Sequence, residues 1–170
     1  MAAANFDVCL EFVFKEEGGY VDDPLDPGGA TNLGITLNVL SEWRHTAVTK
    51  ADVQNLGKDE AGAIYRAKYW NVVRGDDLPA GVDLMVFDAA VNLGAGRSAR
   101  ILQIAVGANP DGAIGPATLE STQGNDSTVL ISKLTDARVA WYQSLSTFSR
   151  FGKGWTARVN RAKQLALQMA

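Results

Sequence analysis

One irregular segment interrupts a sequence whose apolar residues otherwise recur at helical spacing. Residues 20–35 hold two prolines and three glycines and show no helical period. On either side, runs such as 6–14 and 82–90 place apolar side chains three and four positions apart, which is typical of helices, and no continuous alternation indicates a strand. The sequence therefore predicts a mainly helical fold with a short irregular or hairpin segment at residues 20–36. Long ordered loops inside compact domains are often functional.

Length and composition restrict the class of protein further. A chain of 170 residues has room for one domain, or for a small domain with a second lobe. Its 46% hydrophobic and 21% charged residues are ordinary globular values, which exclude a disordered or collagen-like chain. Cys9 is the only cysteine and His45 the only histidine, so an internal disulfide or a cysteine-based zinc site is excluded. We expect no metal and no organic cofactor.

The charge is divided unevenly along the chain. Residues 130–170 carry seven basic and one acidic side chain, whereas residues 1–129 carry nine basic and eighteen acidic ones. Contact of a basic C-terminal helix with an anionic wall or outer-membrane surface is one interpretation. The other interpretation is that the basic charges only complement the helix dipole and neighbouring acidic residues. We expect a monomer and no nucleic-acid partner.

Two features concern boundaries and targeting. The sequence changes character near residues 75–79, which predicts lobes at residues 1–76 and 77–170, packed together as one compact unit. The N-terminal stretch lacks a basic residue before its apolar run, and Glu11 interrupts that run, so it does not resemble a secretory signal. We therefore expect the protein to be made in the cytoplasm.

Glu17 is the first candidate for chemistry. It falls in the last turn of the first predicted helix, directly before Gly18 and Gly19. The partial negative charge at a helix C-terminus and the neighbouring Glu16 both disfavour an ionised carboxylate there. A carboxylic acid that keeps its proton is what a glycosidase needs to protonate a leaving-group oxygen. A solvated glutamate in a frayed turn is the alternative.

The irregular segment supplies candidates for a second carboxylate. Asp22, Asp23 and Asp26 follow Glu17 closely, with Thr31 and Asn32 behind them. A second carboxylate, with a hydroxyl group to hold water, would complete a two-carboxylate glycosidase site. The spacing does not match a calcium-binding EF-hand loop. Aspartates that merely cap turns are the alternative.

The segment from Glu17 to Thr36 carries a resemblance to a known family. It reads EGGYVDDPLDPGGATNLGIT and resembles the signature of glycoside hydrolase family 108, N-acetylmuramidases found in phage endolysins and prophage lysis cassettes. Residues 87–94, 111–119 and 154–158 resemble the predicted peptidoglycan-binding region of the same proteins. The resemblance covers about residues 6–165. It implies a lysozyme-like fold, Glu17 as catalytic acid, a catalytic lobe at 1–76 and a peptidoglycan-binding lobe at 77–170.

A more distant similarity connects the loop with phage lysozymes that carry a Glu-x8-Asp-x5-Thr triad. Asp26 matches the aspartate of that pattern, whereas Thr31 falls one position short and Asn32 occupies the strict position. The similarity implies that Asp26 stabilises positive charge or activates water. Thr31 or Asn32 would orient that water, and Asp22 and Asp23 remain rivals for the second carboxylate.

Further residues are candidates for substrate binding. Trp70 ends a predicted helix beside the lobe boundary and could stack on a sugar ring, although most aromatic residues at helical spacing belong to a core. Asp88 and Asn92 share one helix face and could bind sugar hydroxyl or acetamido groups, or only each other. Gln103 could line a cleft or satisfy buried backbone groups. The full set of binding candidates is Tyr20, Asn32, Trp70, Asp88, Asn92 and Gln103.

The expected function is that of a lysozyme-type peptidoglycan hydrolase. By resemblance it cleaves the β-1,4 bond between N-acetylmuramic acid and N-acetylglucosamine, so peptidoglycan is the expected partner. A lytic transglycosylase acting on the same bond is one alternative, because it also needs an essential acid. A non-catalytic protein that binds the wall or assists secretion is the other.

Overall fold

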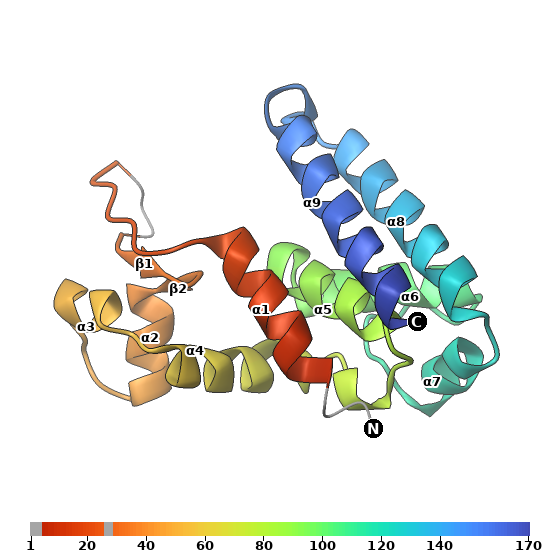
Figure 1. Cartoon of the computed structure of the whole chain (residues 1–170), viewed down its shortest axis with the longest axis horizontal. Coiled ribbons are helices and arrows are strands. Elements are labelled where there is room, and N and C mark those ends of the chain that lie inside the picture. The colour runs from red at the N-terminus through yellow and green to blue at the C-terminus, as the bar shows by residue number, and fades with distance from the viewer. Residues whose placement is uncertain (1–4, 26–28) are drawn as a thin grey trace. The chain divides into compact units, whose positions relative to one another are not determined.

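The computed structural model describes residues 5–25 and 29–170 (Figure 1). Helices dominate, and the only strands among these residues form a two-stranded hairpin, so the mainly helical, lysozyme-like fold is confirmed. The chain divides into two compact units. The first is Leu10–Lys68, and the second contains Tyr69–Ala170 with the described residues before Leu10. None of the described helices is both long and apolar enough to cross a membrane.

The first unit surrounds the hairpin with short helices. Its elements are the C-terminal part of α1 (Asn5–Glu17), β1 (Thr31–Asn32), β2 (Ile35–Thr36), α2 (Leu37–Arg44), α3 (Lys50–Gln54) and α4 (Lys58–Tyr65). Apolar side chains spaced along these helices form its core, including Val13, Leu40, Val53 and Ile64, which are fully buried. The irregular segment expected at residues 20–36 therefore contains the hairpin, although residues 26–28 lie outside the described residues.

Side-chain caps begin two of these helices. The hydroxyl group of Thr36 accepts a hydrogen bond of 3.2 Å from the Val39 amide and starts α2 directly after the hairpin. Thr49 and Asp52 form a reciprocal capping box at the start of α3, as their spacing predicts. Because β2 leads straight into a capped helix, the end of the hairpin at β2 is held in place.

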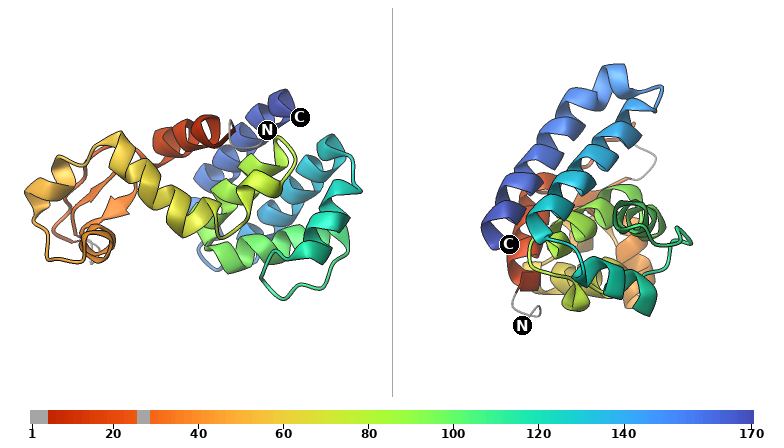
Figure 2. Two further views of the ribbon diagram at one scale, coloured as in Figure 1. Left: turned by 90° about the horizontal axis from the view of Figure 1, so that it is seen from below. Right: turned by 90° about the vertical axis from the view of Figure 1, so that its right-hand side faces the viewer.

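The second unit is built around α5 (Val82–Leu93). Residues 82–90 are all buried, and the helix packs against α6 (Ala95–Val106), α8 (Ser127–Gln143) and α9 (Phe148–Met169). Helix α7 (Pro116–Gln123) packs against α6. A short π-helix, η2 (Arg66–Trp70), and a 3₁₀-helix, η3 (Gly75–Asp77), precede α5 in the chain. Helices α8 and α9 pack side by side as an antiparallel pair (Figures 1 and 2).

One face of α9 packs on this core, against α8 and α5. Val159, Ala162 and Ala166 are buried. By compactness the chain divides between Lys68 and Tyr69, and residues of α1 belong to both units. The division into functional lobes at 1–76 and 77–170 stays a prediction.

Candidate active site

Glu17 is the last residue of α1 and is half-buried. The helix ends there because Gly18 adopts a φ of +79°, a left-handed conformation that glycine reaches without strain. The Gly18 amide still donates a hydrogen bond of 3.0 Å to the Phe14 carbonyl. The predicted helix stop is thus confirmed, and it leaves the Glu17 carboxyl group at the boundary between a helix and the loop.

The hairpin turn lies against Glu17. β1 and β2 pair in the register Asn32–Ile35, which leaves Leu33 and Gly34 as a two-residue turn. Both turn residues have positive φ angles, 51° and 77°, as a type I′ turn requires. The Leu33 carbonyl accepts a hydrogen bond of 2.8 Å from the hydroxyl group of Tyr65, the last residue of α4. This bond ties the turn to a helix that lies 32 residues further along the chain.

Gly34 lets the turn approach the two helices closely. A Cβ atom at this position would overlap the Tyr65 hydroxyl group and would lie 2.9 Å from Cγ of Glu17. Tyr65 is itself buried, with its ring edge-on to Phe14 of α1 at a centroid distance of 5.8 Å. Three elements distant in sequence therefore meet around the aliphatic part of Glu17 and restrict where its carboxyl group can lie.

Thr31 and Asn32 follow each other on β1 and face opposite sides of the strand. The backbone of Thr31 exchanges two hydrogen bonds of 2.8 Å with Val21, and its half-buried side chain lies on the hairpin that carries the turn. Asn32 is 8% exposed, and its amide nitrogen donates to the carbonyls of Val53 and Gln54 at 3.0 and 3.1 Å. Asn32 thus fastens the end of α3, which contradicts its assignment to substrate. Thr31 remains the candidate that orients water.

The carboxylates of the loop have different surroundings. Asp22 accepts a hydrogen bond of 2.9 Å from the ammonium group of Lys50, and this bond raises the pKa of Lys50. Asp23 accepts one of 2.9 Å from the Leu25 amide, in the manner of an Asx turn. Asp26 lies outside the described residues. Tyr20 is exposed at the start of the loop and stays a predicted binding residue.

Trp70 belongs to the core, so the prediction that it stacks on a sugar ring is wrong. The side chain is fully buried, and its indole nitrogen donates a hydrogen bond of 2.9 Å to Asp76. The rings of Phe6 and Phe87 pack edge-on against it, with centroids 5.2 and 5.3 Å away. Gly75 lies so close to the indole that any side chain there would overlap it. A ring enclosed in this way has no face on which a sugar could stack.

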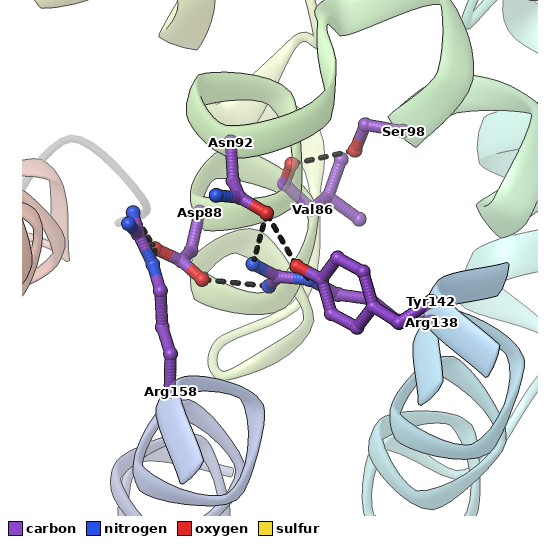
Figure 3. Close-up of polar contacts among 7 residues, drawn as sticks. All are labelled: Val86, Asp88, Asn92, Ser98, Arg138, Tyr142 and Arg158. Atoms are coloured by element: carbon purple, nitrogen blue, oxygen red, sulfur yellow. Dashed lines mark hydrogen bonds and ion pairs between the residues drawn. The ribbon is translucent and has the colours of Figure 1, made fainter. Parts of the chain in front are cut away.

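Asp88 is likewise part of the interior (Figure 3). It is fully buried on α5 and lies between two guanidinium groups. Arg138 of α8 donates to Oδ2 at 2.6 Å, and Arg158 of α9 donates to Oδ1 at 2.8 and 3.1 Å. The predicted contact of Asp88 with sugar is therefore contradicted. Arg158, one of the basic residues of the C-terminal tail, is only 9% exposed, so its charge does not lie on the surface.

Asn92 extends this buried network. Its side-chain oxygen accepts hydrogen bonds from the hydroxyl group of Tyr142 and, at 3.4 Å, from Arg138 (Figure 3). Tyr142 in turn accepts a bond of 3.0 Å from Arg138. Asn92 is half-buried, and its role in binding stays a prediction. The sequence contains one signal for this network. Arg138 lies on the same helix face as Leu130, Leu134 and Tyr142, at intervals of four residues, and a charged residue on such a face indicates a buried partner.

The Gln103 side chain is buried and forms hydrogen bonds with backbone groups, so its assignment to substrate binding is wrong. It is 1% exposed. Its amide nitrogen donates to Asp111 at 2.8 Å and to the Ala113 carbonyl at 3.0 Å, and its oxygen accepts from the Gly112 amide at 2.9 Å. These bonds order the loop that joins α6 to α7. Within the described ranges, no three histidine, cysteine or acidic side chains lie close enough together to hold a metal ion.

Comparisons with known proteins identify the family of the chain. Residues 10–94 match the family model described as Glycosyl hydrolase 108, and residues 97–160 match the Predicted Peptidoglycan domain. A solved structure, SagA of Brucella abortus, superposes with a TM-score of 0.87 at 50% sequence identity, covering 98% of this chain and 96% of that one. A search of curated proteins found no match.

The fold and these matches define a glycoside hydrolase that acts on peptidoglycan. The chain belongs to the glycosyl hydrolase 108 family.

Proposed function

We propose that the protein is an N-acetylmuramidase, which hydrolyses the β-1,4 bond between N-acetylmuramic acid and N-acetylglucosamine with Glu17 as the general acid. The observation that carries this proposal is the setting of Glu17. It ends α1 beside a loop, and the I′ turn at Gly34 packs against its aliphatic part. Catalytic acids need such positioning, because small displacements of a reacting group lower rates strongly.

In this mechanism Glu17 donates its proton to the bridging oxygen while the bond from that oxygen to the anomeric carbon breaks. The sugar ring then carries positive charge, which a second carboxylate stabilises or a water activated by that carboxylate quenches. Asp26 is the proposed second carboxylate. Its rivals have other partners, since Asp22 pairs with Lys50 and Asp23 caps a turn. Thr31 is proposed to orient the water.

We further propose a lysis role of the endolysin type, in which the protein is made in the cytoplasm and acts on the wall after release. Exposed basic side chains of α9, such as Arg161 and Lys153, would favour encounter with an anionic wall through long-range attraction. Arg158 contributes nothing to this attraction because it is buried against Asp88.

The bond specificity is tested by digesting purified sacculi, reducing the products with borohydride and identifying the reduced sugar by mass spectrometry. A muramidase leaves reduced N-acetylmuramic acid at the new ends. Reduced N-acetylglucosamine would assign the cut to the other glycosidic bond. A product lighter by one water, with no reducible end, would identify a lytic transglycosylase. Either of the last two results would overturn the proposal.

A further inference from the structure

A groove on the second unit has no part in the chemistry described above. It lies between α6 and α8, which pack against each other, and encloses about 390 Å³. Hollows of this size accommodate small ligands. Its lining includes Arg97, Ile101 and Ile104 from α6, and Ala137 and Trp141 from α8. All of these residues fall within the match to the Predicted Peptidoglycan domain.

The groove combines a cation with an apolar surface. The guanidinium group of Arg97 lies 3.5 Å from the centre of the Trp141 ring, so the two side chains stack. No acidic side chain of the described chain forms an ion pair with Arg97 in the structure. Ile104 is 65% exposed and leaves apolar area in the groove that a ligand could cover.

The second arginine at the groove is less available. Arg100 lies over Gly112, and its charge contributes to lowering the pKa of Asp111, behind the larger effect of hydrogen bonds from the Ala113 amide and Gln103. Arg100 therefore already has an acidic neighbour. Arg97 lines the same groove and stacks on Trp141, and guanidinium groups bind carboxylates with paired hydrogen bonds.

We propose that this groove binds the stem peptide of peptidoglycan, with a peptide carboxylate on Arg97 and its short aliphatic side chains over Ile104 and the exposed part of Trp141. The proposal rests on the assignment of peptidoglycan as substrate. Stem peptides are anionic and rich in alanine, which complements a cation above an apolar floor. A bare glycan strand complements it poorly, because sugars need many polar partners and the Ser144 hydroxyl at the rim is already bonded to the Trp141 carbonyl.

Binding is tested with the soluble tetrapeptide L-Ala-γ-D-Glu-meso-diaminopimelate-D-Ala, titrated into the full chain and followed by NMR and calorimetry. Arg97→Gln should raise the Kd about tenfold or more, because it removes a charge-assisted hydrogen bond. Arg150→Gln is the matched control. It removes another arginine placed over an aromatic ring, that of Phe151 at 5.0 Å, and should leave the Kd unchanged. An unchanged Kd in Arg97→Gln would overturn the proposal.

Two further arms separate the groove from the active site. Oligomers of N-acetylglucosamine should not displace the tetrapeptide, and displacement would make the groove a glycan site. Arg97→Gln should digest intact sacculi more slowly than wild type, yet equal wild type on glycan strands stripped of peptide by an amidase. Equal loss on both substrates would contradict the proposal. If the proposed bond specificity is wrong, the product masses change while the tetrapeptide still binds.

Discussion

Asp88→Asn tests whether the buried network supports the fold or contacts the substrate. The substitution keeps the shape of the side chain and removes the negative charge that pairs with both Arg138 and Arg158 (Figure 3). Two guanidinium groups would then lose the buried carboxylate that they share. Breaking a buried ion pair by removing one partner costs about 3–5 kcal/mol. At about 2–4 °C per kcal/mol for a chain of this size, the melting temperature should fall by about 10 °C.

Calorimetry and circular dichroism measure this shift directly, with turbidity loss of sacculi at 25 °C as the activity assay. Asp136→Asn serves as the control, because it removes an exposed carboxylate from the same helix as Arg138 and should change stability by no more than about 0.5 kcal/mol. The reasoning predicts a large loss of stability for Asp88→Asn, with most activity kept while the protein is folded. An unchanged melting temperature together with a large loss of activity would refute it and would place Asp88 at the substrate.

Three further predictions concern the loop and a buried acid. Gly34→Ala should destabilise the protein by about 2–5 kcal/mol through strain and overlap, and lower lysis more than tenfold, whereas Gly57→Ala, where a Cβ meets nothing, should leave lysis unchanged. Asp26→Asn should lower the rate on sacculi more than Asp22→Asn, and the reverse order would move the second carboxylate. Burial raises the pKa of Asp83, so as the pH rises past about 3.9 the unfolded chain releases this proton before the folded protein does. The contribution of this group to the free energy of unfolding therefore falls as the pH rises from the pKa of the unfolded chain to the raised pKa of the folded protein. In urea titrations, Asp83→Asn should become more stable relative to wild type between acid and neutral pH. A constant difference in stability between the two proteins over this range would contradict the prediction.

Local signals in the sequence were sufficient to predict much of the first unit. Two successive glycines predict where α1 ends, and the pattern of Thr49 and Asp52 predicts the capping box of α3. Proline and glycine in residues 20–36 predict a segment outside the helical pattern, in which the hairpin forms. Each of these features depends on residues within a few positions of one another, which is the range over which capping and turn preferences act.

Contacts between residues far apart in the sequence could not be predicted from such local signals. Tyr65 receives its role from a carbonyl 32 residues earlier, and Asp88 pairs with arginines 50 and 70 residues later. Trp70 is buried because rings from two other helices enclose it. Spacing along one helix identifies which residues share a face, but it does not reveal what covers that face. Sequence reasoning therefore assigns polar residues such as Asp88 and Gln103 to substrate binding, although their hydrogen-bond partners lie within the protein.

The central claim is that Glu17 is the catalytic acid, and comparison of Glu17→Gln with Glu16→Gln on purified sacculi tests it most directly. The two substitutions make the same change at adjacent, half-buried positions of α1. Glu17→Gln should lower the rate of release of new reducing ends by about 10²–10⁴-fold with the melting temperature nearly unchanged, since loss of a general acid has this effect. Glu16→Gln should stay close to wild type. Activity above about a tenth of wild type in Glu17→Gln, in a protein that remains folded, would contradict the account.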